Sequence, residues 1–381
     1  MQGEMKKISF LFPNFFFIGA QRAAAATIRE LVQRGWTVTV VVFDSSGDMR
    51  KEIPDVVEII ELPKIPLLSS IPFARVFAWP LALRKLFKIK KPTYCISICP
   101  QTNFTMVLYR KFFGKDVIFV GEEHQHLSNA IKNDPGDFKK PWKYLYQFSL
   151  KNYHKLDVLR CVSAAAEQDF VQRWQVPKDK VRAIYPAFDL ERIRSRSHGV
   201  SRNNPVPVIC SVGRLTSQKD FSLLIRAFAQ VAHQTPAVVK IAGTGPEQGA
   251  LIQLINELGL QARVTLLGFV EYAEELVASS DVFVMTSIWE GFPATLVESM
   301  VLGTPVVSVN CESGPAELIE NGVTGLLLNS RDPAHIGQAI IELIENPKLR
   351  KDMSAQAQER VKKFSLSATV SELETVLKSL H

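Results

Sequence analysis

Short apolar runs alternate with amphipathic segments along the chain, and the alternation occurs twice within 381 residues. Apolar runs bounded by turn residues are typical of strands buried on both faces, and the segments between them have helical spacing. The pattern predicts parallel sheets covered by helices. Because a single hydrophobic core rarely grows beyond roughly 250–300 residues, we expect an α/β protein with two doubly wound, Rossmann-like domains.

The predicted elements divide between the two halves of the chain. Strands are expected at 7–12, 37–43, 57–62, 94–99, 117–120, 158–163, 181–185, 206–212, 238–242, 264–267, 282–285, 305–309 and 326–328. Helices are expected at 20–34, 102–113, 141–155, 164–174, 222–232, 247–258, 273–278, 293–302, 316–320 and 333–345. The predicted domains are an N-terminal domain at 1–190, a linker at 191–204, a C-terminal domain at 205–360, and a C-terminal helix at 361–381 that could pack back on the first domain. Since ligands bind at the carboxyl ends of such strands, two domains facing each other would place a site in the cleft between them.

The formal net charge of +7 suits a nucleic acid, an anionic membrane or a phosphorylated substrate as a partner. Residues 1–190 hold 28 Lys and Arg against 18 Asp and Glu, a balance of +10, whereas residues 191–381 hold 17 against 20, a balance of −3. Between Glu61 and Asp116 there is no acidic residue. The positive excess therefore belongs to the first half and is concentrated near residues 64–115.

The cysteines and the first residues indicate a cytoplasmic protein. The five cysteines have no Cys-x-x-Cys spacing and lie mostly in apolar runs, so we expect reduced core thiols. An apolar run after Lys6 and Lys7 resembles a secretion signal. Pro13 and Asn14 interrupt that run, and a strand leading into a helix accounts better for it. No uncharged apolar stretch approaches the ~20 residues of a membrane-spanning helix.

A polar cluster stands at 211–219, where a predicted strand ends and a helix begins. Gly213 allows a tight turn, and Arg214 with Lys219 places two permanent cations at the carboxyl end of the strand. Two cations at this position suit a diphosphate. An exposed loop with solvated charges remains the alternative.

The turn Gly243-x-Gly245 also follows a predicted strand and leads into a helix. It lacks the third glycine of the dinucleotide fingerprint, so we do not expect an NAD site. Taken alone, such a turn indicates either a close approach to a ligand or a simple bend in the chain.

The most specific segment surrounds Glu290 and Glu298. Pro293 stands where a first helical residue would be, and Gly303 marks the expected end of the helix. Amides of the first turn, around 294–296, would bind phosphate oxygens with help from the helix dipole. The two carboxylates are better partners for sugar hydroxyls than for phosphate. A capping role for Glu290 and a solvated position for Glu298 remain the alternative.

Taken in order, these motifs resemble the C-terminal domain of retaining glycosyltransferases of family 4, which have the GT-B fold of two Rossmann-like domains facing across a cleft. The matching residues are Arg214-x4-Lys219, Gly243-x-Gly245-Pro246, Glu290-Gly-Phe-Pro with Glu298, and Gly303-x-Pro305-Val-Val. The resemblance implies a donor site made of Gly19, Gly213, Arg214, Lys219, Gly243, Gly245, Glu290, Gly291, Phe292, Pro293, Leu296 and Glu298.

By the same resemblance, Arg214 and Lys219 neutralise the diphosphate of the donor. Glu290 contacts the transferred sugar, and Glu298 holds the ribose. Stabilisation of the leaving group by fixed cations fits the lack of an Asp-x-Asp triplet, so we expect no metal and no cofactor, with a UDP-sugar or a GDP-sugar as donor.

The N-terminal half resembles the family more loosely. Gly19 retains the second glycine of the family's Gly-Gly loop, whereas Ile18 replaces the first. Trp36 replaces the histidine of an Arg-Gly-His-x-Val motif, a change that we expect to be structural. The segment 185–189 stands where the family has an Asn-Pro-x-Asp or Asn-Gly-x-Asp motif, and we assign it only a hinge role.

A histidine near the transferred sugar is also implied by the family. In Val120-Gly-Glu-Glu123-His124 this role falls to His124, with Glu123 as a weaker candidate. His126 lies only two positions away and remains a rival, and a loop histidine without a role is the alternative. The resemblance thus gives Glu290, His124, Arg214 and Lys219 as catalytic residues.

The acid-free stretch combines aromatic and basic residues in one helical segment, 71–91, interrupted only at Pro80. This composition suits a helix in a membrane interface whose cations meet anionic lipid. The membrane-facing candidates are Phe73, Phe77, Trp79, Arg84, Lys85 and Lys88. A helix packed on the core with a solvated basic face is the alternative, and nucleic acid fits less well because no recognised binding motif is present.

The sequence therefore predicts a cytoplasmic enzyme, peripheral on the inner face of the cell membrane, that transfers a sugar from a nucleotide sugar to an acceptor hydroxyl with retention of configuration. The predicted acceptor is a saccharide or lipid-linked saccharide of polysaccharide or lipopolysaccharide biosynthesis. Two alternatives stay open: a nucleotide-sugar epimerase on the same fold, and a nucleotide-binding module without catalysis.

Overall fold

The computed structural model describes residues 6–16, 19–63, 74–133 and 142–380. The chain forms two compact units. Unit 1 comprises residues 1–188 together with 364–381, and unit 2 comprises residues 189–363.

Unit 1 is built on a seven-stranded parallel sheet with the strand order β3-β2-β1-β4-β5-β6-β7. Its strands are β1 (Lys7–Phe12), β2 (Thr37–Val42), β3 (Glu58–Glu61), β4 (Tyr94–Ser97), β5 (Ile118–Glu123), β6 (Val158–Cys161) and β7 (Val181–Ala183). Its helices are α1 (Gly19–Gln33), α2 (Ala74–Lys90), α3 (Pro100–Phe113), α4 (Leu127–Asn133), α5 (Trp142–Asn152), α6 (Ala164–Gln172) and α15 (Leu366–Ser379).

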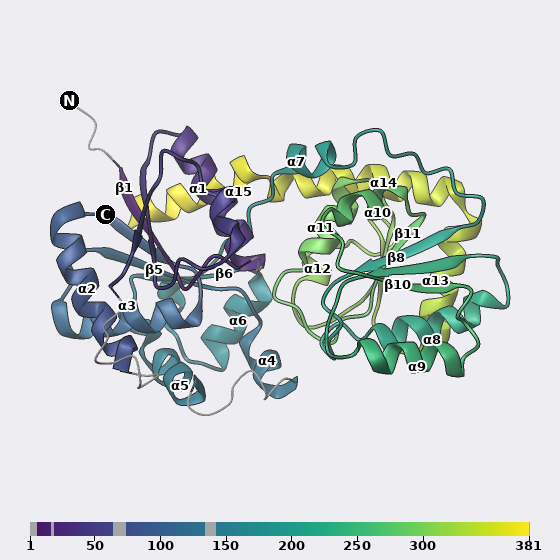
Figure 1. Ribbon diagram of the computed structural model, residues 1–381, viewed down its shortest axis with the longest axis horizontal. Helices are drawn as coiled ribbons and strands as arrows, with labels where there is room; N and C mark the ends of the chain where they lie inside the picture. The colour runs from purple at the N-terminus through teal and green to yellow at the C-terminus, as the bar shows by residue number, and fades with distance from the viewer. Residues whose placement is uncertain (1–5, 17–18, 64–73, 134–141, 381) are drawn as a thin grey trace. The chain divides into compact units, whose positions relative to one another are not determined.

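Helices cover both faces of this sheet (Figure 1). On one face Ile28 of α1 and Leu373 of α15 pack against strand side chains such as Val40. On the other face Phe87 of α2 and Phe170 of α6 belong to a second buried cluster. The strands are apolar on both faces because both faces are covered, as the alternation in the sequence predicts.

Helix α15 lies near the end of the chain yet belongs to unit 1. Its Glu374 accepts a hydrogen bond from Trp36 Nε1 at 2.7 Å and pairs with Arg34 Nη1 at 2.9 Å. Val370 and Leu377 of the same helix are fully buried. Trp36 is itself buried, so the expectation of a structural role for this residue is confirmed.

Unit 2 is built on a six-stranded parallel sheet with the order β10-β9-β8-β11-β12-β13. Its strands are β8 (Val208–Val212), β9 (Val238–Ala242), β10 (Val264–Gly268), β11 (Val282–Met285), β12 (Val306–Val309) and β13 (Leu326–Leu328). Its helices are α7 (Leu190–Ser195), α8 (Phe221–Ala232), α9 (Gln248–Glu257), α10 (Ala273–Ser279), α11 (Ala294–Val301), α12 (Pro315–Leu318), α13 (Pro333–Glu345) and α14 (Pro347–Arg360).

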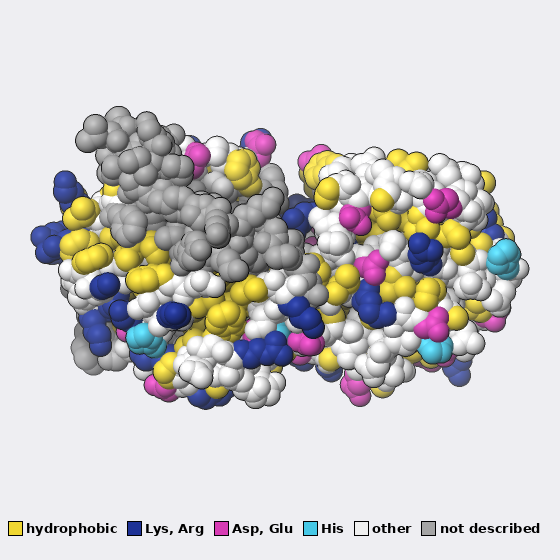
Figure 2. Space-filling view, turned by 90° about the horizontal axis from the view of Figure 1, so that it is seen from below, with side chains coloured by type: hydrophobic (Ala, Val, Ile, Leu, Met, Phe, Trp, Pro, Cys, Tyr) yellow, Lys and Arg dark blue, Asp and Glu magenta, His cyan; other side chains and the backbone are white. Residues whose placement is uncertain are grey.

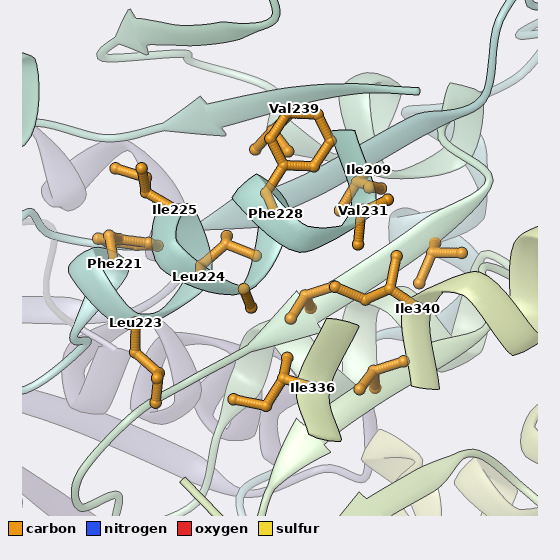
Figure 3. Close-up of a cluster of buried hydrophobic side chains, with 14 of the residues drawn as sticks. Ile209, Phe221, Leu223, Leu224, Ile225, Phe228, Val231, Val239, Ile336 and Ile340 are labelled. Atoms are coloured by element: carbon orange, nitrogen blue, oxygen red, sulfur yellow. The ribbon is translucent and has the colours of Figure 1, made fainter. Parts of the chain in front are cut away.

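The largest buried cluster of unit 2 lies beneath α8 and α13. Leu224 and Phe228 of α8 share this cluster with Ile336 and Ile340 of α13, and Val239 contributes to it from β9 (Figure 3). The apolar residues of α8 recur at helical spacing on the side that faces the sheet. This packing fixes α8, whose preceding loop carries Arg214 and Lys219.

The prediction of an α/β protein with two doubly wound domains is confirmed. The predicted linker differs from the structure, because α7 occupies its beginning. The stretch that follows α7 is bound to unit 2: Arg196 pairs with Glu274 at 2.8 Å, and Arg202 donates to the carbonyl of Gly303 at 3.2 Å.

Strand β5 also differs from the prediction. It continues beyond Val120 through Gly121, Glu122 and Glu123, which we expected to follow the strand. Both carboxylates are buried, and they lie on opposite faces of the sheet. Glu122 pairs with Arg160, and Glu123 accepts a hydrogen bond from Tyr146. The last three residues of β5 show no alternation of apolar and polar side chains, so the sequence pattern does not indicate that the strand continues through them.

Candidate active site

Two loops of unit 2 follow adjacent strands, β8 and β11, at the point where the strand order reverses. Ligands of doubly wound sheets bind at the carboxyl ends of the strands beside such a reversal. The β8–α8 loop carries Arg214 and Lys219, and the β11–α11 loop carries Glu290. The fold therefore brings the predicted donor-site cations and the predicted sugar-binding carboxylate to one edge of the sheet.

Hydrogen bonds hold these two loops together. The amide of Ile288 donates to the carbonyl of Gln218 at 2.8 Å, and Gln218 Nε2 donates to the carbonyl of Trp289 at 2.9 Å. The hydroxyl of Thr286 donates to the carbonyl of Asp220 at 2.8 Å. These contacts, one between backbone groups and two from side chains to backbone carbonyls, fix the position of the β11–α11 loop against the start of α8.

Lys219 and Glu290 form an ion pair, with Lys219 Nζ 2.6 Å from Glu290 Oε1. Both side chains are largely enclosed, with exposed fractions of 17% and 7%. Arg214 is exposed and lies on the same loop as Lys219. An incoming anion would compete with Glu290 for Lys219, and separating the pair requires another partner for the buried Glu290 carboxylate.

The glycines of the β9–α9 turn allow this loop to lie against the β8–α8 loop. A Cβ atom at Gly243, where φ is +144°, would overlap the carbonyl oxygen of Gly213, and one at Gly245 would overlap the carbonyl of Leu215. The amide of Leu215 donates to the carbonyl of Thr244 at 2.9 Å. Gly243 and Gly245 therefore support the loop that carries the two cations.

Helix α11 begins one residue later than predicted. Pro293 is the N-cap, with φ −77° and ψ 97°, rather than the first helical residue. The amide of Leu296 donates to the Pro293 carbonyl at 3.1 Å, so the expectation of a free Leu296 amide is wrong. Helix geometry leaves the amides of Ala294 and Thr295 without an intrahelical acceptor, and these two amides can face an anion.

The loop after β12 supports the start of α11. Ser313 Oγ donates to the carbonyl of Gly291 at 2.8 Å, and a Cβ at Gly314 would overlap the Pro293 ring. Phe292 precedes the helix and Glu298 lies in its second turn, and both are partly exposed. Gly303, with φ +70°, follows the last turn of α11, as predicted.

Cys311 is a residue of this region that the sequence analysis did not single out. Burial raises the pKa of its thiol to about 12, and the nearby Glu290 carboxylate acts in the same direction. The thiol is therefore protonated at neutral pH and contributes bulk rather than charge. Its place beside Glu290 depends on the pairing of β11 with β12, which no local motif reveals.

The second group of predicted site residues lies at the end of β5 in unit 1. His124 Nε2 lies 3.1 Å from Glu122 Oε2, and Glu122 Oε1 accepts from Arg160 Nη1 at 2.5 Å. The exposed fraction of the His124 side chain is 17%, so its ring remains partly accessible. The buried side chain of His126 lies with Nδ1 3.8 Å from Asp169 Oδ2.

Glu123 points to the other face of the sheet and is buried. Its carboxylate accepts hydrogen bonds from Asn103 Nδ2 at 3.0 Å, from Tyr146 Oη at 3.1 Å and from Tyr153 Oη. Burial raises the pKa of Glu123, although these donors oppose the shift. The network joins β5 to α3 and α5, so we assign Glu123 a structural role in place of the weaker candidacy that the sequence suggested.

Gly19 is the first residue of α1, at the carboxyl end of β1. It is exposed, and no described atom lies within 4 Å of a Cβ built at this position. Packing within unit 1 therefore does not require a glycine here. A glycine at this position would still allow a ligand to approach the backbone closely.

The membrane-facing candidates fall on or before α2. Phe73 and the side chain of Phe77 lie outside the described residues. Trp79 stacks on Phe43 with ring centroids 3.8 Å apart, so this indole packs on the core instead of projecting outward as predicted.

The basic candidates on α2 do face outward. Arg84, Lys85 and Lys88 are exposed, and the Arg84 guanidinium lies 4.6 Å above the ring of Phe113. Hydrophobic and basic side chains gather beside one another on the visible face of unit 1 (Figure 2). Among the described residues, no helix has both the length and the apolar character needed to cross a membrane.

Within the described ranges, no group of three or more His, Cys, Asp or Glu side chains is placed to hold a metal ion.

Comparison with known proteins identifies the family. Residues 18–192 match Glycosyltransferase Family 4, and residues 195–360 match Glycosyl transferases group 1. The chain is similar to the N-acetylgalactosamine-N,N'-diacetylbacillosaminyl-diphospho-undecaprenol 4-alpha-N-acetylgalactosaminyltransferase of Campylobacter jejuni. The two are 33% identical over 265 residues, and the match covers 69% of this chain and 70% of that protein. A second C. jejuni enzyme, the GalNAc-alpha-(1->4)-GalNAc-alpha-(1->3)-diNAcBac-PP-undecaprenol alpha-1,4-N-acetyl-D-galactosaminyltransferase, is 25% identical over 368 residues, and the match covers 95% of this chain and 96% of that protein.

A solved structure, that of Anabaena HepE in complex with UDP, matches with a TM-score of 0.77. The identity is 22%, and the match covers 98% of this chain and 100% of that one. This likeness supports the fold, which is the GT-B fold expected from the sequence. The chain therefore belongs to glycosyltransferase family 4 and is a glycosyltransferase.

Proposed function

We propose that this glycosyltransferase transfers a sugar from a nucleoside diphosphate sugar, with retention of configuration, to a lipid-linked saccharide. The observation that carries the proposal is the Lys219–Glu290 ion pair beside the strand reversal of unit 2. The two C. jejuni relatives are named for transfer to undecaprenol-linked saccharides, which supports the acceptor class. HepE is named in complex with UDP, which supports a uridine diphosphate sugar as the first donor to test.

In the proposed mechanism the diphosphate draws Lys219 away from Glu290. Arg214 and Lys219 then neutralise the charge that develops on the leaving diphosphate, and the amides of Ala294 and Thr295 add hydrogen bonds. Glu290, released from Lys219, accepts hydrogen bonds from hydroxyls of the transferred sugar. The exchange couples donor binding to the availability of the carboxylate. The bond between the anomeric carbon and the diphosphate breaks through an oxocarbenium-like transition state, and the acceptor oxygen bonds to that carbon on the same face. The acceptor proton leaves with the diphosphate, and the step uses neither a metal nor a protein nucleophile.

Further roles in the proposal follow the family resemblance. Glu298 holds the ribose, and Gly19 lets the unit 1 backbone approach the donor. His124 positions the transferred sugar.

Nucleotide binding tests this proposal directly. UDP at 100 times its dissociation constant stabilises a protein by roughly 2.7 kcal/mol, which raises the melting temperature of a unit of this size by about 5–10 °C. We expect that shift with the wild-type chain and a much smaller one with Lys219→Ala. Lys348→Ala, which removes an exposed lysine on α14, is the control and should behave as wild type. Equal shifts in both variants would rule out Lys219 as a diphosphate ligand.

Product analysis separates the proposed reaction from its alternatives. A retaining transferase consumes the donor only with an acceptor and gives a product whose anomeric configuration, read by NMR, matches that of the donor. An epimerase converts the nucleotide sugar without an acceptor. A binding module shows the thermal shift but neither transfer nor hydrolysis.

We also propose that unit 1 binds the cytoplasmic face of the membrane through the outward side of α2. Leu81, Lys85, Lys88 and Ile89 share one face of this helix, because their spacing of three or four residues aligns them. Leu81 is 56% exposed and Ile89 is 76% exposed. Phe112, at the end of α3, adds an aromatic ring that is 61% exposed. Apolar tips framed by lysines suit the interface of an anionic bilayer.

Liposome co-sedimentation tests the membrane proposal. Each lysine near an anionic surface contributes about 1 kcal/mol, so a Lys85→Ala, Lys88→Ala double variant should bind anionic vesicles roughly 30-fold more weakly. Ile89→Glu should weaken binding as well. Ile252→Glu is the matched control, since Ile252 is 46% exposed on α9 of unit 2. Binding that is unchanged in the double variant, or absent in the wild type, would contradict the proposal.

A further inference from the structure

We propose that Glu122 and Arg160 are positioning residues that hold the imidazole of His124 in one orientation and one tautomer. This inference rests on the proposed function, in which His124 positions the transferred sugar. Glu122 lies inside the Val120–His124 motif but has no role assigned to it by the family resemblance, and Arg160 belongs to none of the motifs. The proposal concerns how His124 is presented and does not depend on which sugar is transferred.

The strand geometry places the three side chains in a chain of contacts. Glu122 and His124 are two positions apart at the end of β5, so both project from the same face of the sheet. Arg160 stands directly opposite Glu122 on β6 in the strand register. The carboxylate therefore lies between the other two, 2.5 Å from Arg160 Nη1 and 3.1 Å from His124 Nε2.

Arg160 is fixed by the backbone as well as by Glu122. Its Nε donates to the carbonyl of Ile184 at 3.2 Å, and its Nη2 donates to the carbonyl of Tyr185 at 2.8 Å. The exposed fractions of the Arg160 and Glu122 side chains are 4% and 3%. Because three acceptors fix the Arg160 guanidinium, it has little rotational freedom. The Glu122 carboxylate that it binds is restricted in the same way.

The charge state of Glu122 decides which ring nitrogen of His124 carries a proton. Burial alone would raise the pKa of Glu122, but Arg160 and His124 lower it to about 2. The carboxylate is therefore ionised at neutral pH and can only accept hydrogen bonds. Nε2 of His124 must then be the donor, and a neutral ring presents Nδ1 as an acceptor for a sugar hydroxyl.

The segment after His124 is anchored separately. The amide of Ser128 donates to Asp169 Oδ2 at 3.0 Å, and His126 lies against the same carboxylate. His124 thus stands between two buried anchors, Glu122 before it and Asp169 after it. The second anchor holds the backbone, whereas only Glu122 contacts the His124 ring in the described contacts.

The ring tautomer is the readout that a purely structural role would not change. Nitrogen-15 NMR of the histidine rings should show the Nε2–H form for His124 in the wild-type chain, with the signal assigned by its loss in His124→Asn. In Glu122→Gln an amide replaces the obligate acceptor, and we expect a mixture of tautomers. A wild-type ring in the Nδ1–H form would overturn the proposal whatever the variants do, and so would an unchanged tautomer in Glu122→Gln.

Kinetics supply the second readout. Loss of a residue that orients a metal-ligating histidine typically costs 10- to 100-fold. By analogy, Glu122→Gln should lower kcat by roughly that factor with little change in the KM for the donor. Arg160→Lys keeps the charge but cannot bond both carbonyls and Glu122, and it should show a smaller loss of the same kind. Should Glu122→Gln fail to fold, the kcat of Arg160→Lys and the His124 tautomer of the wild-type chain still test the positioning role.

Glu374→Gln is the matched control, because Glu374 is also an ion-paired carboxylate of unit 1 but contacts Arg34 and Trp36. It should keep the wild-type kcat and the wild-type His124 signal. A kcat within twofold of wild type in Glu122→Gln would overturn the positioning role. Failure of the proposed function is distinguishable, since it appears as a wild-type chain that transfers no sugar from any nucleotide donor.

Discussion

Replacing Glu290 by Gln is expected to lower kcat by about 100- to 1,000-fold, the usual cost of removing one preorganised group from a transition-state contact. The carboxylate is buried and held 2.6 Å from Lys219, so its position is set before any substrate arrives. The amide has the same shape but carries no charge, and it cannot accept hydrogen bonds through both of its terminal atoms. Lys219→Ala should cause a loss of similar size because it removes a cation from the leaving diphosphate.

The two variants should differ in how they fail. Lys219→Ala weakens donor binding as well as turnover, whereas Glu290→Gln acts chiefly on kcat. Asp281→Asn is the control in the same unit, since Asp281 precedes β11 at the opposite edge of the sheet and accepts from the amide of Val208 at 2.9 Å. It should leave kcat unchanged. A Glu290→Gln enzyme with near-normal turnover would remove Glu290 from the mechanism.

Replacing Gly243 by Ala is expected to destabilise unit 2 by about 3 kcal/mol or more. The residue has φ +144°, which an alanine adopts only with strain, and its Cβ would overlap the carbonyl oxygen of Gly213. The β8–α8 loop would have to move, and Arg214 and Lys219 would move with it. The variant should therefore lose donor binding together with stability.

Gly249→Ala is the matched control for this prediction. Gly249 lies in α9, and no described atom is within 4 Å of a Cβ built there. Alanine in a helix is favoured over glycine by roughly 0.5–1 kcal/mol, so this variant should be slightly more stable than wild type. Urea unfolding followed by circular dichroism measures both. A Gly243→Ala chain with an unchanged urea midpoint would show that the loop tolerates the methyl group.

The central strands could be predicted closely because their apolar runs end sharply at polar residues. The bounds expected for Val238–Ala242 and Val282–Met285 agree with the structure. Helix α14 (Pro347–Arg360) was not predicted, because only Met353 and Ala357 among its residues are buried and no apolar stripe marks it. A helix stabilised mainly by polar and terminal contacts gives little periodic signal.

The candidate site was partly predictable for a related reason. Each loop motif is local, so Arg214, Lys219 and Glu290 could be singled out from short segments. The pairing of Lys219 with Glu290 joins residues 71 positions apart and follows from the adjacency of β8 and β11. Arg160 gave no signal at all, since an arginine inside a short apolar strand has no motif and its partner lies on a neighbouring strand.

The docking of α15 has a consequence for the order in which the protein can fold during synthesis. Most domains fold as units while the chain emerges, beginning with the N-terminal one. Here the buried cluster around Ile28 also requires Val370, Leu373 and Leu377. Unit 2 is continuous in sequence and can close first, whereas unit 1 keeps an open apolar face until residues 366–379 have left the ribosome. Until then the nascent first unit exposes apolar side chains that the complete unit buries.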